Sequence, residues 1–163
     1  MIEALFALAL VVVGVSDGDT LTVQDGDVKM VLRLAEIDAP ERTQPYSQVS
    51  RRNLEALCRD AKAVRFEPVD TDRYGRTVAH VHCDGVHVNW RQVEDGFAWC
   101  FTRYLKHPDE CLPAERTARA ERRGLWREAD PVSGRGQRES SLNSHRSTAT
   151  RTKTCAATRC CSL

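Results

Sequence analysis

The sequence has almost no net charge and very little lysine. Its 163 residues include 24 lysines and arginines against 23 aspartates and glutamates, which leaves a formal net charge of +1. The net charge alone therefore gives no sign of a nucleic-acid-binding protein, for which a basic excess is the usual electrostatic mark. Lysine occurs only at positions 29, 62, 106 and 153, so nearly all cations are arginine. Arginine binds phosphate through a planar pair of donors, but codon usage in a GC-rich genome explains most surface arginines as well.

No apolar run in the sequence is long enough to span a bilayer, which takes about 20 residues. The run at residues 4–13 contains Ala-Leu-Ala at 7–9, which resembles a signal-peptidase site. Glu3, however, stands where a secretory signal carries a positive charge. Residues 1–9 are therefore expected to be either a signal remnant or the lead-in to the first strand. The first alternative predicts a secreted or periplasmic protein.

The sequence also lacks any Cys-x-x-Cys pair, which argues against a structural zinc site. Seven cysteines are nevertheless present, which is an odd number. An oxidising compartment would permit one or two disulfides among the four in the body of the chain, Cys58, Cys83, Cys100 and Cys111. Their spacing leaves the pairing open. The cysteines at positions 155, 160 and 161 are expected to be incidental.

A valine-rich apolar run predicts a strand over residues 10–15, and alternation of apolar and polar residues predicts strands over 20–23 and 28–35. Residues 63–69 and 76–83 are also predicted to be strands. Asp-Gly pairs at 17–18 and 25–26 are typical of tight hairpin turns, so the first three strands form a meander. Helical patterns cover residues 47–60, 88–94 and 109–123.

The helix ends and faces can also be assigned from the sequence. Ser47 is expected to be the N-cap of the first helix. The apolar stripe of that helix is expected to contain Val49, Leu54, Leu57 and Cys58. Gly124 is expected to be the C′ residue of the last helix, because glycine readily adopts the left-handed backbone found there.

Five strands with a helix between the third and the fourth have the order of an OB-fold barrel, an α+β fold that is mainly β and has about three helices here. Such barrels commonly bind nucleic acids or oligosaccharides. We place this domain at residues 10–127. Residues 128–163 are rich in Arg, Ser, Thr and Gly and poor in large apolar side chains, so we expect a disordered tail there. A frameshift or an unrelated extension would explain the tail's composition.

Three carboxylates are expected to converge at one end of the barrel. Asp19 precedes the second strand, and Asp38 and Glu41 follow the third, so the hairpin brings them together. Converging carboxylates repel one another unless a cation or a proton offsets their charge. A hard divalent ion with oxygen ligands is the natural solution, and calcium suits a loop-built, hydrated site. Taken singly, each aspartate is explained more simply as a turn residue.

Two arginines are the next candidates. Arg33 lies within the third strand, on the face opposite to Leu32 and Leu34. Arg76 follows a glycine, which permits an unusual backbone or a close approach. Each is explained equally well as a surface side chain. Beside a metal ion, however, the two would form a clamp that stabilises the extra charge of a phosphoryl transition state.

The remaining conspicuous side chains are predicted to be structural. Trp90, Trp99 and Trp126 are expected in the core or at an interface rather than as base-stacking platforms, because large aromatic side chains dominate core burial. His80 and His82 share one strand face, but no third ligand falls near them in the pattern. We therefore predict no metal site at the two histidines.

Four short motifs together resemble the signatures of the thermonuclease, or staphylococcal nuclease-like (SNase-like), family. They are VSDGDT at 15–20, RLAEIDAPE at 33–41, DRYGR at 72–76 and GLW at 124–126. They occur in the family's order and at its approximate spacings, and the resemblance covers roughly residues 10–127. The family's fold is an OB barrel with three helices, in agreement with the strand pattern.

The resemblance implies a role for each carboxylate. Asp19 and Asp38 correspond to the carboxylates that hold calcium, and Ala39 stands where the family supplies a backbone carbonyl to the ion. Glu41 matches the glutamate that orients or deprotonates the attacking water. In this mechanism water attacks phosphorus in line and the 5′ oxygen leaves, so the product carries a 3′-phosphate.

The resemblance also implies how the substrate is bound. Arg33 and Arg76 match the two arginines that grip the scissile phosphate. Where the family's model nuclease has two tyrosines near the nucleotide, this chain offers Thr102 and Tyr104. Tyr74 is available for a phosphate hydrogen bond or a base contact. A lost stacking contact would weaken binding by roughly 1–3 kcal/mol per base.

The sequence therefore predicts a calcium-dependent endonuclease of low sequence specificity, monomeric, that acts on single-stranded DNA, with RNA open as a second substrate. One alternative is a non-catalytic OB-fold module that only binds nucleic acid. Another is a damaged nuclease, suggested by the abrupt start and the unusual tail.

Overall fold

The structure is a computed structural model that describes residues 10–127. The predictions of a signal remnant at residues 1–9 and of a disordered tail at 128–163 lie outside the described residues. Within residues 10–127, no helix is both long enough and apolar enough to cross a membrane.

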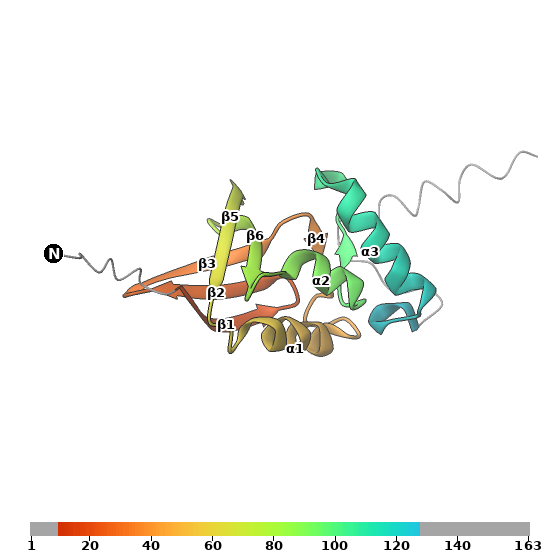
Figure 1. The fold of residues 1–163 in the computed structure, drawn as a ribbon, viewed down its shortest axis with the longest axis horizontal. Helices are drawn as coiled ribbons and strands as arrows, with labels where there is room; N and C mark the ends of the chain where they lie inside the picture. Colours follow the sequence, from red (N-terminus) through yellow and green to blue (C-terminus); the bar gives the residue numbers. More distant parts are fainter. Residues whose placement is uncertain (1–9, 128–163) are drawn as a thin grey trace, which may run out of the picture.

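The order of the elements agrees with the sequence pattern. Five long strands carry the sheet, and a helix follows the third of them (Figure 1). In chain order the elements are β1 (Val11–Asp17), β2 (Thr20–Asp25), β3 (Val28–Leu34), β4 (Ile37–Asp38), α1 (Ser47–Cys58), β5 (Val64–Thr71), β6 (Thr77–Cys83), β7 (Val86–His87), α2 (Val88–Glu94), β8 (Trp99–Cys100), the 3-10 turn η1 (Thr102–Tyr104), α3 (Pro108–Ala120) and the 3-10 turn η2 (Gly124–Arg127).

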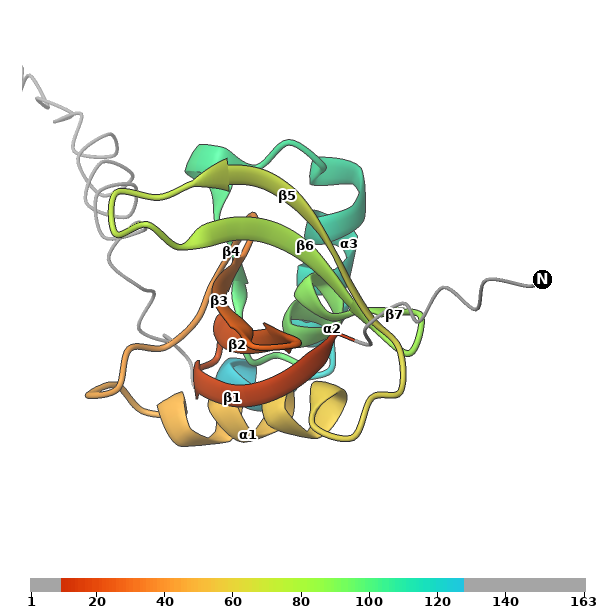
Figure 2. The same ribbon diagram turned by 90° about the vertical axis from the view of Figure 1, so that its left-hand side faces the viewer.

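The main sheet has the strand order β1-β2-β3-β6-β5, with the short β7 paired to β6. The meander β1-β2-β3 and the hairpin β5-β6 are antiparallel, and the two units join where β3 pairs with β6 in parallel. Figure 2 shows the β5-β6 hairpin arching over the meander, while α1 lies along β1. The chain is thus an OB-like α+β fold that is mainly β and has three helices, as the sequence predicts.

Two registers bring the candidate site together. In the meander Thr20 pairs with Arg33, so Asp19, one residue earlier, lies at the end of β3. In the parallel pair Arg33 lies opposite Val78, which places the start of β6, and Arg76 just before it, near the same end.

The core follows the predicted alternation along the strands. Leu21, Leu32 and Leu34 are fully buried, and Leu54 and Cys58 of α1 close the same cluster. Burial of each of these leucines stabilises the fold by roughly 1.5–3 kcal/mol relative to leaving it exposed.

Two disulfides join the helices to the sheet elements. Cys58 of α1 is bonded to Cys83 of β6, and Cys100 of β8 to Cys111 of α3. The prediction of one or two disulfides among these four cysteines is confirmed. Their pairing, which the sequence left open, depends on the tertiary fold.

Two predictions for α1 are wrong. Val49 was expected in the apolar stripe but is 41% exposed. Ser50 is buried in its place because its hydroxyl donates to the carbonyl oxygen of Phe97 at 2.7 Å. The N-cap is Tyr46, in a left-handed conformation and with no side-chain capping bond, and Ser47 is the first helical residue.

The C′ residue of α3 is also not the predicted one. Arg122 adopts the left-handed backbone, with φ of 52°, and the N–H of Arg123 donates to the carbonyl oxygen of Ala118. This is the hydrogen-bond pattern of a Schellman motif. Glycine is required at position 124 for a different reason, which is close packing. A Cβ there would lie 2.3 Å from the carbonyl oxygen of Gly96.

The tryptophans are structural, as predicted. Trp99 and Trp126 are buried in a second cluster that joins β8 to α3 and η2. The guanidinium carbon of Arg119 lies 4.0 Å from the centre of the Trp126 ring. Trp90 is partly buried, and its ring N–H donates to Glu110 at 2.8 Å.

Candidate active site

Asp19 is the buried centre of the candidate site. It is only 4% exposed, and its carboxylate accepts hydrogen bonds from the hydroxyl of Thr20 and the N–H of Ala39. The tight turn before it needs a glycine, because a Cβ on Gly18 would lie 1.7 Å from the hydroxyl oxygen of Ser50. The turn therefore presses against α1 and directs Asp19 inward.

Arg33 bridges the two predicted metal-binding aspartates. Its Nη1 donates to Oδ2 of Asp19 at 2.7 Å, and its Nη2 donates to Oδ1 of Asp38 at 3.3 Å. The side chain of Arg33 is 21% exposed. Charge-assisted hydrogen bonds of this kind are roughly twice as strong as neutral ones. The three residues form one connected group at the end of β3.

Arg76 reaches the same group through a residue that the sequence did not single out. Its Nε donates to Asp72 at 2.7 Å and its Nη1 to the hydroxyl oxygen of Thr20 at 3.3 Å. Thr20 in turn donates to Asp19 at 2.9 Å. Thr20 thus connects Arg76 to Asp19, the carboxylate that also accepts from Arg33. Asp72 orients Arg76.

The carboxylates of this group repel one another. The pKa of Asp19 is raised to about 7, mainly by burial. The charge of Arg33 opposes this increase, and the charges of Asp17 and Asp38 contribute to it. The pKa of Asp38 is raised for the same reasons, first by burial, and Glu41 adds to it. A divalent cation would offset this repulsion, and every side-chain donor present is an oxygen, so the residues fit a hard metal ion.

Ala39 and Glu41 lie beside these carboxylates. The N–H of Ala39 donates to Asp19 at 3.3 Å, which is a contact of its amide and not of its carbonyl. The N–H of Glu41 donates to the side chain of Gln44 at 2.8 Å, which fixes the loop after β4. The carbonyl role of Ala39 and the catalytic role of Glu41 stay predictions.

The two predicted substrate-binding tyrosines are placed differently. Tyr74 is 67% exposed, and the guanidinium of Arg76 lies 5.6 Å from its ring centre, so it borders the site. Tyr104 is 59% exposed and contacts Phe101 and Arg103. The structure thus places Tyr74 beside Arg76, whereas the ring of Tyr104 contacts Phe101 and Arg103, which are close to it in the chain.

Two buried amides of α2 support the site, and the sequence analysis missed both. Asn89 donates to the carbonyl oxygens of Ala35 and Ala79 and accepts from the N–H of Val81. Gln92 donates to the carbonyl oxygen of Gly18 at 2.8 Å. The sequence did carry a signal for these two residues, because the two amides interrupt an otherwise apolar face of the helix. Buried polar groups must find hydrogen-bond partners.

Comparison with known proteins identifies the family of the chain. The family model for staphylococcal nuclease homologues matches residues 31–128. The chain belongs to this family of staphylococcal nuclease homologues. The match includes Arg33, Asp38, Glu41 and Arg76, and it begins after Asp19.

Curated relatives within this family carry nuclease names. An "uncharacterized endonuclease" of Haemophilus influenzae is 40% identical over 122 residues, which are 74% of this chain and 67% of the relative. One from Escherichia coli is 41% identical over 123 residues, or 74% of this chain and 78% of the relative. A "probable staphylococcal-like nuclease" of rice (Oryza sativa subsp. japonica) is 37% identical over 103 residues, 63% of this chain and 30% of the relative.

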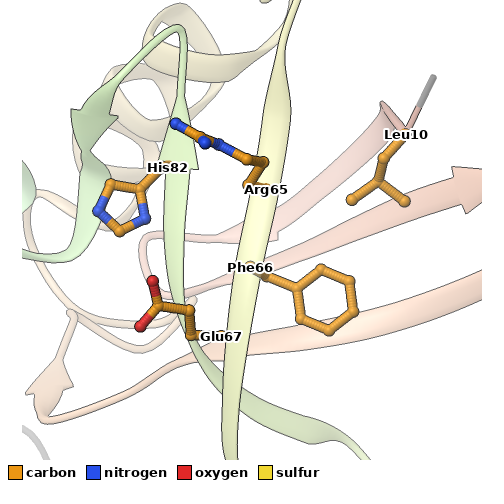
Figure 3. A pocket seen from close by; sticks show the side chains of 5 residues that line it. All are labelled: Leu10, Arg65, Phe66, Glu67 and His82. Carbon is orange, nitrogen blue, oxygen red and sulfur yellow. The ribbon is translucent and has the colours of Figure 1, made fainter. Parts of the chain in front are cut away.

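One cavity among residues 10–127 lies apart from the predicted site residues. A cavity of about 450 Å³ is lined by Leu10, Arg65, Phe66, Glu67 and His82. In Figure 3 Phe66 extends to the same side of β5 as Leu10, whereas Arg65 and Glu67 lie toward His82. None of the predicted site residues lines this cavity.

The structure places two further ligand-type side chains beside one of the two histidines. Glu36 and His107 lie beside His80, so two further ligand-type side chains do fall near it. His82 faces His87 instead, with ring centres 4.6 Å apart. Sequence spacing could not show this cluster, because its members come from a turn, a strand and a helix start that are far apart in the chain.

Proposed function

We propose that the protein is a metal-dependent nuclease that hydrolyses phosphodiester bonds of nucleic acids. The observation that carries the proposal is the connection of Arg33 and Arg76 to one buried carboxylate, Asp19, through direct contact and through Thr20. Two guanidinium groups beside converging carboxylates suit a phosphate and a metal ion together. The nuclease names of the relatives support this assignment.

Arg33 and Arg76 bind the scissile phosphate and stabilise the charge that develops on it. Their donors are oriented before substrate arrives, because Asp19 and Asp38 fix Arg33 and Asp72 fixes Arg76. Such pre-oriented donors are commonly worth about 100-fold to 1,000-fold in rate for each one removed.

Glu41 is the proposed general base that takes a proton from the attacking water. It lies close enough to Asp38 for its charge to raise the pKa of that residue. The leaving 5′ oxygen gives products with a 3′-phosphate.

Calcium is the proposed metal. Asp19, Asp38 and the backbone carbonyl of Ala39 would hold it. Bound there, the ion would neutralise phosphate charge and act as a Lewis acid. The oxygen-only donor set and the mutual repulsion of the carboxylates support this choice over a transition metal.

The proposed substrate is single-stranded DNA, with RNA as a second substrate, cut with little sequence preference. Tyr74 offers an exposed ring beside Arg76, and Tyr104 a second exposed ring. A base stacked on such a ring gains roughly 1–3 kcal/mol without base-specific hydrogen bonds. We propose further that the protein acts as a monomer in a secreted or periplasmic setting, where its two disulfides persist.

Cleavage of end-labelled single-stranded DNA in calcium, and then in excess chelator, tests the proposal. Wild type should cut only with calcium, and Arg76→Ala and Glu41→Gln should each lose about 100-fold or more. Arg52→Ala, an exposed arginine on α1, is the matched control and should cut like wild type. Calcium-independent binding without cleavage would overturn the enzyme assignment in favour of a non-catalytic OB-fold module.

A further inference from the structure

Glu36, His80 and His107 come from distant parts of the chain and present their ligand atoms to one another. Glu36 lies in the turn between β3 and β4, His80 on β6, and His107 just before α3. Oε1 of Glu36 is 3.2 Å from Nε2 of His80 and 2.7 Å from Nδ1 of His107. All three ligand atoms lie within 4.8 Å of one another.

His80 is buried, and its ring nitrogens make no well-formed hydrogen bond within residues 10–127. It is 7% exposed, and neither ring nitrogen has a hydrogen-bond partner among residues 10–127. Nε2 is near Oε1 of Glu36, but its approach lacks hydrogen-bond geometry. A buried polar group without a partner costs about 1–3 kcal/mol. A bound ion is one of the few explanations for such a group in a folded protein.

Glu36 is held in the orientation that a metal ligand needs. Its Oε2 accepts the backbone N–H groups of Lys106 and His107 at 2.7 and 2.8 Å, so Oε1 faces the two imidazoles. Outer hydrogen bonds of this kind orient ligands around metals. Glu36 also has a φ of 62°, an unusual backbone for a non-glycine residue, and such residues cluster at functional sites.

The cluster is accessible and His80 is in the form that binds metals. The side chain of His107 is 49% exposed, so an ion can enter from solvent at that side. Burial lowers the pKa of His80, against the opposing charge of Glu36, so its imidazole is neutral at pH 7. Neutral imidazole is the ligand form of histidine.

We propose that Glu36, His80 and His107 bind a zinc-class transition metal ion at a site separate from the proposed calcium site. Two imidazoles and one carboxylate, with a fourth position open to water, are an established zinc ligand set. Zinc–nitrogen bonds of about 2.0–2.1 Å place ligand atoms roughly 3.3 Å apart, close to the separation of Glu36 and His80. The ion would tie the turn before Asp38 to β6 and to the start of α3.

Cobalt binding to the full chain tests the proposal, because tetrahedral cobalt has strong visible absorption bands. Cys155, Cys160 and Cys161 are replaced by serine throughout to remove other soft ligands, and excess calcium occupies the proposed active site. The parent protein should bind one cobalt ion with a tetrahedral spectrum, and zinc should displace it. His107→Gln, at a half-exposed position that tolerates substitution, should weaken binding about tenfold or more, as should His80→Gln.

Two controls separate this site from its surroundings. His82→Gln changes a histidine on the same face of β6, and Asp38→Asn changes the proposed calcium site; both should keep the cobalt spectrum. A parent protein without tetrahedral cobalt, or His107→Gln binding as tightly as the parent, would overturn the proposal. Loss of the spectrum in Asp38→Asn would likewise overturn it, because the ion would then belong to the active site.

Discussion

The guanidinium of Arg33 donates to the carboxylate of Asp19 at 2.7 Å, across the β2-β3 hairpin and from 14 residues away in the chain. Asp38 accepts the second arm of the same guanidinium. The planar fork of arginine is what allows one side chain to bridge two carboxylates, and the single ammonium of lysine cannot reproduce it.

We therefore expect Arg33→Lys to retain the fold but lose most activity. The positive charge remains near Asp19, so the free energy of unfolding should fall by only about 1–2 kcal/mol. The proposed phosphate contact loses a guanidinium group that Asp19 and Asp38 hold in place, so kcat should drop about 100-fold. Thermal unfolding and DNA cleavage measure the two effects, and Arg52→Lys is the control. Wild-type kcat in Arg33→Lys would contradict the assigned role.

Metal removal should destabilise the fold. An ion that binds only the folded state adds about 2.7 kcal/mol at 100 times its Kd. If calcium binds as proposed, it should raise Tm in wild type, and Asp19→Asn should abolish the increase because it removes a proposed carboxylate ligand. Asp25→Asn, at the other end of β2, should show the full increase. An equal calcium effect on Asp19→Asn would place the ion elsewhere.

Asn89→Ala should be strongly destabilising. It removes two hydrogen bonds to the carbonyl oxygens of Ala35 and Ala79 and leaves the buried N–H of Val81 without its acceptor. Unsatisfied buried groups cost about 1–3 kcal/mol each, so we expect a loss of about 3 kcal/mol or more in urea unfolding. Gln24→Ala removes one exposed side-chain bond and should stay within about 0.5 kcal/mol of wild type. Similar values for the two variants would refute this.

Each disulfide should contribute about 3 kcal/mol to the free energy of unfolding. The Cys58–Cys83 bond closes a longer loop than Cys100–Cys111, with sequence separations of 25 and 11, so its loss should cost slightly more in the loop-closure model. Paired serine variants unfolded in urea give the two values. Unchanged stability on loss of either bond would show that the bond adds nothing beyond packing.

Gly96→Ala should cost more than backbone strain alone. Gly96 has a φ of 79°, and a Cβ there would lie 2.4 Å from the carbonyl oxygen of Arg123. Gly85 has nearly the same φ, 81°, but open space around it. Gly85→Ala should therefore cost about 1–2 kcal/mol, the left-handed penalty, and Gly96→Ala clearly more. Equal losses in urea unfolding would show that the backbone at Arg123 moves away from the added Cβ at little cost.

The sequence by itself determined the five long strands, the meander and the convergence of Asp19 with Asp38. Asp-Gly turns and period-two alternation are local signals, and a hairpin with a fixed register leaves few choices for which residues face each other. The sequence predicted the helix ends and the buried helix face less accurately. Tertiary contacts decided that Ser50 is buried while Val49 is exposed, and that Arg122 takes the left-handed position expected for Gly124.

Only the tertiary structure decided which distant segments meet. The parallel pairing of β3 with β6 brings Arg76 to Thr20, and the packing of α2 brings Asn89 and Gln92 beneath the site. The same applies to the disulfide pairing and to the cluster of Glu36, His80 and His107. Such contacts depend on burying the whole apolar surface at once, a property that no short stretch of sequence carries.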